Sequence, residues 1–378
     1  MRSIAKAMDE KARPLRKGWT TGACATAAAK AAYTALLTGE FPDPVEVTLP
    51  GGQRPSFALA TTARGNRMAT AGVVKDAGDD PDVTHGALIL ATVRPGAAGA
   101  GVTFHAGEGV GIVTRPGLPI PPGEPAINPV PRRMIGEAIA EVAAAHGGNG
   151  DVEVEISVPN GEALAAKTLN GRLGIVGGLS ILGTTGIVIP YSCSSWIHSI
   201  HRGIDVARAC SLSHIAASTG ATSEAAVQKM YDLPETALID MGDFVGGTLK
   251  YVKTHPVPLV TIAGGVGKMV KLAQGLLDLH SKRGSVDLDA LAKLAVNAGG
   301  SEELATRIRA SNTAAEALGH AQHDGIALGD AVALKAQETA VDVVAGKDVA
   351  IEIVVFDRDG KPVGRAPPHA APPRKRRR

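Results

Sequence analysis

The densest group of titratable side chains in this chain lies in the segment Lys75–Gly86. It holds aspartates at positions 76, 79, 80 and 82 and a histidine at position 85. Carboxylates and an imidazole on a loop can act as general acids or bases, or stabilise developing positive charge. The candidate catalytic residues are therefore Asp76, Asp79, Asp80 and His85, and the competing interpretation is an ordinary solvated turn. The spacing resembles a Ca²⁺ loop, but the last-position glutamate and flanking helices of an EF-hand are missing, so no metal is predicted.

A second candidate site is the apolar, glycine-rich segment Gly171–Pro190. Residues 173–176 predict a short buried strand, and a helical pattern begins near Ser194. A strand, a glycine loop and a helix in this order are typical of cofactor sites in α/β proteins. This pattern predicts that the cofactor contacts the glycines and threonines of the segment: Gly177, Gly178, Gly183, Thr184, Thr185 and Gly186. The alternative is that Gly177 and Gly178 merely end a strand.

Two nucleotide-binding motifs fail on spacing. The segment Ala263–Met269 resembles a P-loop, but its first glycine is misplaced and Met269 stands where Ser or Thr is required. No G-x-G-x-x-G follows Val176, and the second predicted strand of the series ends in Ser218 rather than an acidic residue. ATP hydrolysis and an NAD fingerprint are therefore disfavoured.

Acidic residues follow the third predicted strand of that series. Asp240 and Asp243 could bind ribose hydroxyls at the carboxyl edge of a parallel sheet, although Asp243 could equally be a helix N-cap. Asp240, Gly264 and Gly265 therefore join the candidate cofactor-binding residues.

Basic side chains suggest an anionic partner. Arg132 and Arg133 stand at the start of a predicted helix, where cations are unfavourable for the helix dipole. Lys167 and Arg172 flank the start of the glycine-rich segment, and ordinary surface charge is the alternative for all four. Thr20 and Thr21, at the start signal of a predicted helix over 23–37, complete the candidate substrate-binding residues.

The bulk properties exclude several classes of protein. The chain has 378 residues, a net charge of +2 and only 3% aromatic residues. Neither a field that attracts DNA or a membrane nor aromatic surfaces for single-stranded nucleic acid are expected. The three cysteines lack a C-x-x-C motif, and no secretory signal is evident, so a cytoplasmic protein without structural zinc is expected.

The order of elements predicts two folded domains. Residues 1–17 are expected to be a flexible leader, and 18–165 an α+β domain on the substrate side. Strands alternate with helices over 166–360, which predicts a Rossmann-like domain with a mostly parallel sheet that binds the cofactor. Residues 361–378 are expected to form a disordered basic tail.

The motifs together resemble the cobalt-precorrin-5B C(1)-methyltransferase family of anaerobic cobalamin biosynthesis. The resemblance runs from about residue 16 to residue 360 and rests on four segments: Gly18–Cys24, Lys75–Gly86, Gly123–Arg132 and Ala166–Gly186. One departure is Asn170-Gly171, where the family is expected to have Asn-Pro. The resemblance implies S-adenosylmethionine as methyl donor, a corrinoid acceptor methylated at C-1, and no assigned catalytic residues.

Such an acceptor carries many carboxylate groups, which arginine pairs bind well. The rival interpretations are an NAD-type oxidoreductase and a non-enzymatic corrinoid or nucleic-acid binder that uses the basic tail. Partners other than the corrinoid, whether nucleic acid or membrane, are not expected. The sequence leaves open whether the protein forms a homo-oligomer and whether the acceptor already holds cobalt.

Overall fold

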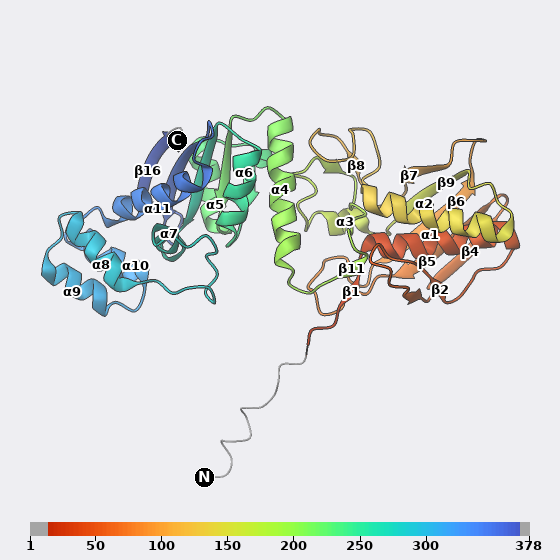
Figure 1. Cartoon of the computed structure of the whole chain (residues 1–378), viewed down its shortest axis with the longest axis horizontal. Coiled ribbons are helices and arrows are strands. Elements are labelled where there is room, and N and C mark those ends of the chain that lie inside the picture. Colours follow the sequence, from red (N-terminus) through yellow and green to blue (C-terminus); the bar gives the residue numbers. More distant parts are fainter. Residues whose placement is uncertain (1–13, 371–378) are drawn as a thin grey trace, which may run out of the picture. The chain divides into compact units, whose positions relative to one another are not determined.

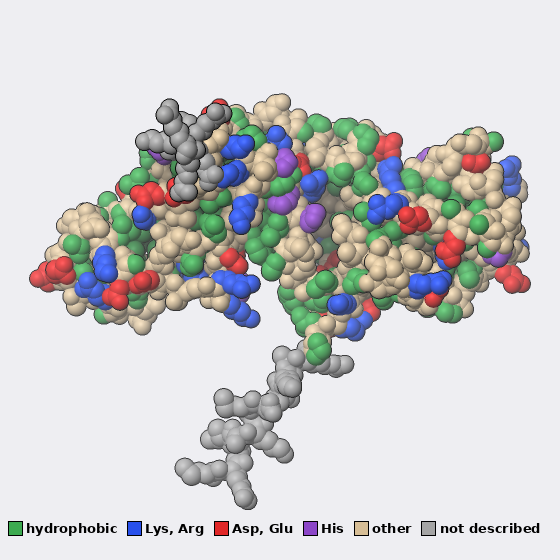
Figure 2. Space-filling model, in the orientation of Figure 1, with side chains coloured by type: hydrophobic (Ala, Val, Ile, Leu, Met, Phe, Trp, Pro, Cys, Tyr) green, Lys and Arg blue, Asp and Glu red, His purple; other side chains and the backbone are tan. Residues whose placement is uncertain are grey.

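The computed structural model describes residues 14–370, which form a mixed α/β structure (Figure 1). The chain divides into two compact units between Ser192 and Cys193. This division differs from the expected boundary at 165/166, because residues 166–192 fold with the first unit. Acidic and basic side chains are interspersed on the face that Figure 2 shows, in keeping with the near-neutral net charge.

The first unit is built on a five-stranded sheet with the order β4-β5-β6-β9-β7. Neighbouring strands are antiparallel except for β7 and β9, which are parallel. The strands are β4 (Thr61–Gly65), β5 (Met68–Val74), β6 (Leu88–Pro95), β7 (Val102–Ala106) and β9 (Val152–Ser157). Three two-stranded ladders surround it: β1 (Gly18–Trp19) with β11 (Ile187–Val188), β8 (Ile112–Val113) with β10 (Ile175–Val176), and β2 (Val45–Glu46) with β3 (Ser56–Phe57).

Helix α1 (Thr21–Thr38) lies at the centre of this unit and is buried on nearly all sides. Its alanines allow it to pack closely against both β5–β6 and α2 (Pro129–His146), because a methyl side chain keeps backbones near each other. Thr20 caps the helix by accepting a hydrogen bond from the Ala23 amide at 3.2 Å, as its threonine start signal predicts. A short helix, α3 (Gly161–Ala165), follows β9.

The second unit holds a sheet with the order β13-β12-β14-β15-β16. The strands are β12 (His214–Ser218), β13 (Leu238–Asp240), β14 (Leu259–Gly265), β15 (Ala350–Phe356) and β16 (Pro362–Ala370). The first four in this order are parallel, and β16 is antiparallel to β15. The chain leaves β12 toward β13 on one side and later returns to β14 on the other, so the direction of winding changes between β12 and β14.

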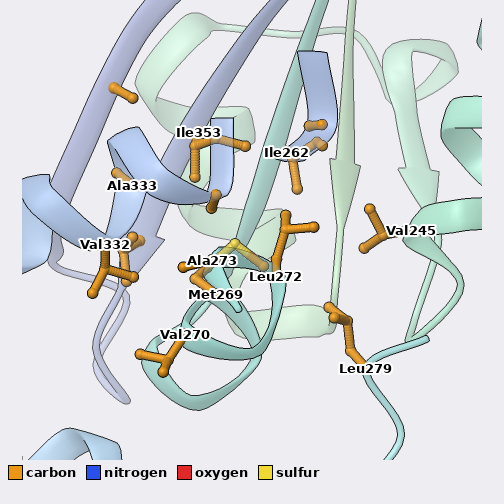
Figure 3. Packing of buried hydrophobic residues seen from close by; sticks show 14 of the residues in the cluster. Val245, Ile262, Met269, Val270, Leu272, Ala273, Leu279, Val332, Ala333 and Ile353 are labelled. Atoms are coloured by element: carbon orange, nitrogen blue, oxygen red, sulfur yellow. The ribbon is translucent and has the colours of Figure 1, made fainter. Parts of the chain in front are cut away.

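Helices cover both faces of this sheet. Helix α5 (Ala221–Tyr231) packs on one face, and α4 (Cys193–Ala209), α6 (Val245–Thr254), α7 (Val266–Ala273) and α11 (Leu328–Val344) share the core of the other. Figure 3 shows that core, in which Met269 and Ile262 are fully buried. A 3₁₀ turn (Glu235–Ala237) precedes β13, and α8 (Leu288–Asn297), α9 (Glu302–Ala310) and α10 (Ala314–His323) extend the unit.

Three expectations about local structure are wrong. The strand predicted at 173–176 is only the two-residue β10, antiparallel to β8, and it does not start the parallel sheet. The helical pattern of residues 302–321 predicts one helix, but Thr313 accepts a hydrogen bond from the Glu316 amide and starts a second one. Residues 362–370 of the expected disordered tail form β16. Residues 1–13 and 371–378 lie outside the described part of the chain.

A buried carboxylate ties β16 to the sheet. Glu352 of β15 is 1% exposed and accepts hydrogen bonds from Arg365, Tyr231 and Thr261 at 2.6–2.9 Å. Burial and the hydrogen bond to Glu352 raise the pKa of Tyr231 to about 12. The last strand therefore supplies the charge that balances a buried anion.

Replacing Arg365 with Met should lower the free energy of unfolding by about 3–5 kcal/mol, because Glu352 would stay buried without its cation. Denaturant unfolding of the full chain measures the change. The matched control is Arg358→Met on an exposed turn residue, expected to change stability by less than about 0.5 kcal/mol. Equal stabilities of the two variants would contradict this role of Arg365.

Candidate functional site

Three segments that are distant in sequence meet at the start of α1 in the first unit: residues 14–21, 75–86 and 180–191. We call this assembly the three-segment surface. The amide of Thr20 donates to the Gly186 carbonyl at 3.0 Å, and Thr21 exchanges hydrogen bonds with the backbone of Leu182 at 3.0 and 3.1 Å. The structure thus brings Thr20 and Thr21 together with the predicted cofactor residues Gly183 and Gly186.

Glycines make this close approach feasible. A Cβ atom on Gly18 would lie 2.0 Å from the carbonyl carbon of Ala77, and one on Gly183 would lie 2.3 Å from the hydroxyl of Thr20. Gly183 also has a φ of +138°, which L side chains rarely adopt. Gly18 and Gly183 therefore allow segments of the first unit to pack closely against each other. The expected order of strand, glycine loop and helix is interrupted, because β11 stands between the glycines after β10 and the start of α4.

The acidic loop is held by contacts that use each candidate carboxylate. Arg16 forms an ion pair with Asp76, with a second contact at 2.9 Å, and its amide donates to Asp79 at 2.6 Å. Asp80 accepts a hydrogen bond from the Tyr191 amide at 2.8 Å. The three aspartates therefore fasten the other two segments to the loop.

A buried lysine holds the same loop from the protein interior. Lys75 is 1% exposed, and its ammonium donates to Asp82 and Thr84, both at 2.5 Å. Burial alone would raise the pKa of Asp82, but the charge of Lys75 and the hydrogen bonds of Lys75 and Thr84 lower it. Arg16 and Lys75 were not among the predicted site residues, although a lysine beside four aspartates already signals internal charge pairing.

His85 is oriented by the backbone. Its Nδ1 atom accepts a hydrogen bond from the Ala77 amide at 3.1 Å and lies 3.8 Å from Asp76. A ring that accepts at Nδ1 carries its proton at Nε2 when neutral, so the half-exposed Nε2–H is a hydrogen-bond donor. This arrangement suits His85 to binding an anionic or carbonyl oxygen better than to removing a proton.

The hydrogen bonds that Asp76 accepts decide whether it can act as a general base. The hydrogen bond from Arg16 lowers the pKa of Asp76 to about 2, which makes it a weak proton acceptor near neutral pH. The geometry therefore favours a positioning role for the acidic loop over general base catalysis.

Apolar side chains are exposed along the three-segment surface. Tyr191 is 68% exposed, and Ile189, Leu15, Leu182 and Val83 are also exposed. Single exposed apolar residues are ordinary, but a group beside polar anchors is typical of a binding surface. The surface can therefore contact a large, partly apolar ligand.

The predicted cationic residues have different environments. Arg132 donates to the backbone carbonyls of Ile127 and Pro125 and to Glu124, and it covers the ring of Phe104. It is therefore engaged in holding the start of α2. Arg133 is exposed and lies 3.8 Å from Glu137, Lys167 is exposed, and Arg172 is half-buried.

Gly178, another predicted cofactor residue, packs against a different part of the first unit. A Cβ atom on Gly178 would lie 2.3 Å from the backbone of Gly109, and Asn170 donates to the Gly178 carbonyl at 3.1 Å. The remaining predicted cofactor residues of the first unit, Gly177, Thr184 and Thr185, are exposed. Asp240, Gly264 and Gly265 belong to the second unit.

In the second unit, the candidate site is the carboxyl edge of the parallel sheet. Because β12 is the first strand of this sheet, Asp240 ends the second strand rather than the third. An acidic residue at that position commonly binds a ribose hydroxyl. The argument that an acid is missing from the second strand is therefore wrong.

The P-loop resemblance fails in the structure as it does in the sequence. Met269 is fully buried in the core (Figure 3), where a Ser or Thr would have to reach Mg²⁺. Lys268 donates to the Thr219 carbonyl at 2.8 Å and lies 3.0 Å from Asp243. Its ammonium thus joins the loops that follow β12, β13 and β14.

Sequence reasoning missed two residues at this edge. Ser218 is fully buried at the end of β12 and its hydroxyl has no partner within residues 14–370. Trp196 is 47% exposed and donates from its indole to the Asp240 carbonyl at 3.1 Å. The position of Ser218 at a strand end was a usable signal, whereas the contact of Trp196 depends on tertiary structure.

Residues 14–370 contain neither a candidate metal site nor a candidate membrane-spanning helix. No group of three or more His, Cys, Asp or Glu side chains there is arranged to hold a metal ion. No helix in this range is long and apolar enough to cross a membrane.

Comparison with known proteins reveals the family. The CbiD family model matches residues 8–190, and the model of the CbiD C-terminal domain matches residues 278–367. A protein of Agrobacterium fabrum named cobalt-precorrin-5B C(1)-methyltransferase is 65% identical over 95% of this chain and 94% of its own length. The chain belongs to the CbiD family.

Further CbiD relatives agree. A protein of the same name from a Bradyrhizobium species is 62% identical over 97% of this chain and 98% of its own length. The crystal structure of the cobalamin biosynthesis protein CbiD from Archaeoglobus fulgidus is 25% identical, with a TM-score of 0.38, over 82% of this chain and 85% of that chain. The family models and the two named relatives confirm the resemblance inferred from the sequence.

Replacing Gly18 with Ala should destabilise the protein by about 3 kcal/mol, because the new Cβ atom would overlap the Ala77 backbone. Thermal or denaturant unfolding measures the effect. Gly171→Ala is the control, since a Cβ there meets nothing within 4 Å. A Gly18→Ala variant as stable as this control would show that the segments are not tightly packed.

The Arg16–Asp76 pair should stabilise the folded protein above about pH 4, by an amount that solvent screening of an exposed pair keeps small. The pKa of Asp76 falls from 3.8 to about 2 on folding, so this stability is lost as the pH decreases through that range. Unfolding of the wild type and Asp76→Asn over a pH series tests it. The stability difference should shrink as the pH falls below about 4 and disappear only below about pH 2, where the carboxyl is protonated in both states. A constant difference would contradict the assignment.

Proposed function

We propose that this chain transfers a methyl group from S-adenosylmethionine to C-1 of cobalt-precorrin-5B, which gives cobalt-precorrin-6A in cobalamin biosynthesis. The observation that carries the proposal is the 65% identity to the A. fabrum enzyme of that name over nearly the whole of both chains. Such identity along the full length supports a common reaction, whereas a shared fold alone would not.

The second unit is a Rossmann-like domain in this proposal and binds the methyl donor. Ligands of open α/β sheets bind at the carboxyl edge where the direction of winding changes, which here is between β12 and β14. Gly220 follows β12 and Gly265 is the last residue of β14, and a Cβ atom on either would meet nothing within 4 Å, which leaves room for a ligand. The donor supplies an electrophilic methyl group on a sulfonium ion when bound.

Individual side chains of this edge suit the parts of the donor. The carboxylate of Asp240 can accept hydrogen bonds from ribose hydroxyls. Trp196, which lies beside it, offers an exposed aromatic face to the adenine ring. Gly264 is crowded by Met269 and Thr219, so it supports the edge without facing a ligand.

The first unit binds the corrinoid in this proposal. The apolar side chains of the three-segment surface contact the macrocycle, and the Nε2–H of His85 donates to one of its peripheral carboxylates. The exposed Arg133 and Lys167 are available for further carboxylates. The chain supplies no covalent nucleophile, so positioning of the acceptor carbon provides much of the acceleration.

An NAD-type oxidoreductase is the rival on the same sheet. The Asp240 position suits NAD as well as the methyl donor, so two other observations count against the rival: the absence of G-x-G-x-x-G after β12 and the names of the relatives. A cytoplasmic location and a role without nucleic acid remain predictions of the sequence.

Incubation of the purified protein with cobalt-precorrin-5B and S-adenosylmethionine should add one methyl group, detected by mass spectrometry of the corrinoid. Calorimetry should show binding of S-adenosylhomocysteine and none of NAD. The control variant is Gly171→Ala, which should retain full turnover. A folded protein that binds NAD and leaves the corrinoid mass unchanged would contradict the proposal.

A further inference from the structure

Two helices, α5 and α7, begin at the carboxyl edge of the sheet, after β12 and β14, without a side-chain cap. Gly220 precedes α5, Gly265 precedes α7, and neither start has a side-chain cap hydrogen bond. The first amides of a helix lack partners within the helix and carry partial positive charge. The two loops touch, because Lys268 of α7 donates to the Thr219 carbonyl at 2.8 Å.

The unpartnered hydroxyl of Ser218 lies at the same place. Ala216, two residues earlier in β12, packs in a buried cluster with Val227 of α5. Side chains two residues apart share a face of a strand, so Ser218 lies on the α5 side of the sheet, at the edge where α5 begins. A buried hydroxyl without a partner is unfavourable, and a ligand that accepts its hydrogen bond would recover that cost.

The charges around this point favour an anion with a neighbouring cation. Lys268 provides a positive charge, which Asp243, 3.0 Å from it, and Glu224 in the first turn of α5 partly offset. A zwitterionic α-amino acid group matches this pattern, since its carboxylate suits the helix start and its ammonium suits a carboxylate.

We propose that Ser218 and the first turn of α5 bind the methionyl carboxylate of the methyl donor. This assignment rests on the proposed function. It orients the donor along the edge, with the amino acid end over β12 and the ribose toward Asp240 at the end of β13.

Calorimetry with two ligands tests the assignment. S-Adenosylhomocysteine contains the amino acid group, whereas 5′-methylthioadenosine shares its adenosine and thioether but lacks that group. Wild-type protein should bind the first at least about tenfold more tightly. Ser218→Ala should weaken S-adenosylhomocysteine about tenfold, as loss of a hydrogen bond to a charged group predicts, and leave methylthioadenosine unchanged.

The variant is expected to fold, because the hydroxyl it loses has no partner within residues 14–370. Ser311→Ala is the matched control: this buried serine of the second unit donates to the Arg307 carbonyl, and its loss should alter neither affinity. Equal weakening of both ligands by Ser218→Ala, or no weakening, would overturn the assignment. Wild-type protein that binds neither ligand would contradict the proposed function and, with it, this assignment.

Discussion

The first unit depends on backbones that approach each other where no side chain fits. Gly18 lies against Ala77, Gly78 against the Arg16 carbonyl, and Gly183 against Thr20. These contacts join three segments separated by up to about 170 residues of chain, and hydrogen bonds from Arg16 and Tyr191 to aspartates fix their register. The exposed apolar side chains of the three-segment surface owe their positions to that packing, although the surface consists mostly of loops.

The second unit follows a different constraint. Parallel strands need helical crossovers, and the reversal of winding between β12 and β14 leaves an edge where two helix starts and a buried serine lie together. The same sheet accepts a buried carboxylate at Glu352 because β16 returns with Arg365. One end of the sheet thus has satisfied polar groups, whereas Ser218 at the carboxyl edge retains an unsatisfied one.

Regular elements were predictable where periodicity is strong. The sequence patterns predict strands at 68–74 and 214–218 and helices at 288–297 and 328–344. The structure has these four elements with the same bounds. The two-residue β10 was not predictable, since its partner β8 lies some 60 residues earlier and its own sequence is too short to specify pairing. That error shifted the count of strands, so Asp240 was assigned to the third strand of the parallel sheet rather than the second. The aspartates of the acidic loop were found from composition, but their engagement by Arg16 and Tyr191 depends on tertiary contacts.

The edge strands of the sheet in the second unit, β13 and β16, have a consequence for aggregation. β13 has only three residues, and β16 carries prolines at 362, 367 and 368, which lack the amide hydrogen that a neighbouring strand would need. Another chain therefore finds little to pair with on either side. The proline content that made this stretch look unstructured protects the protein from edge-to-edge aggregation.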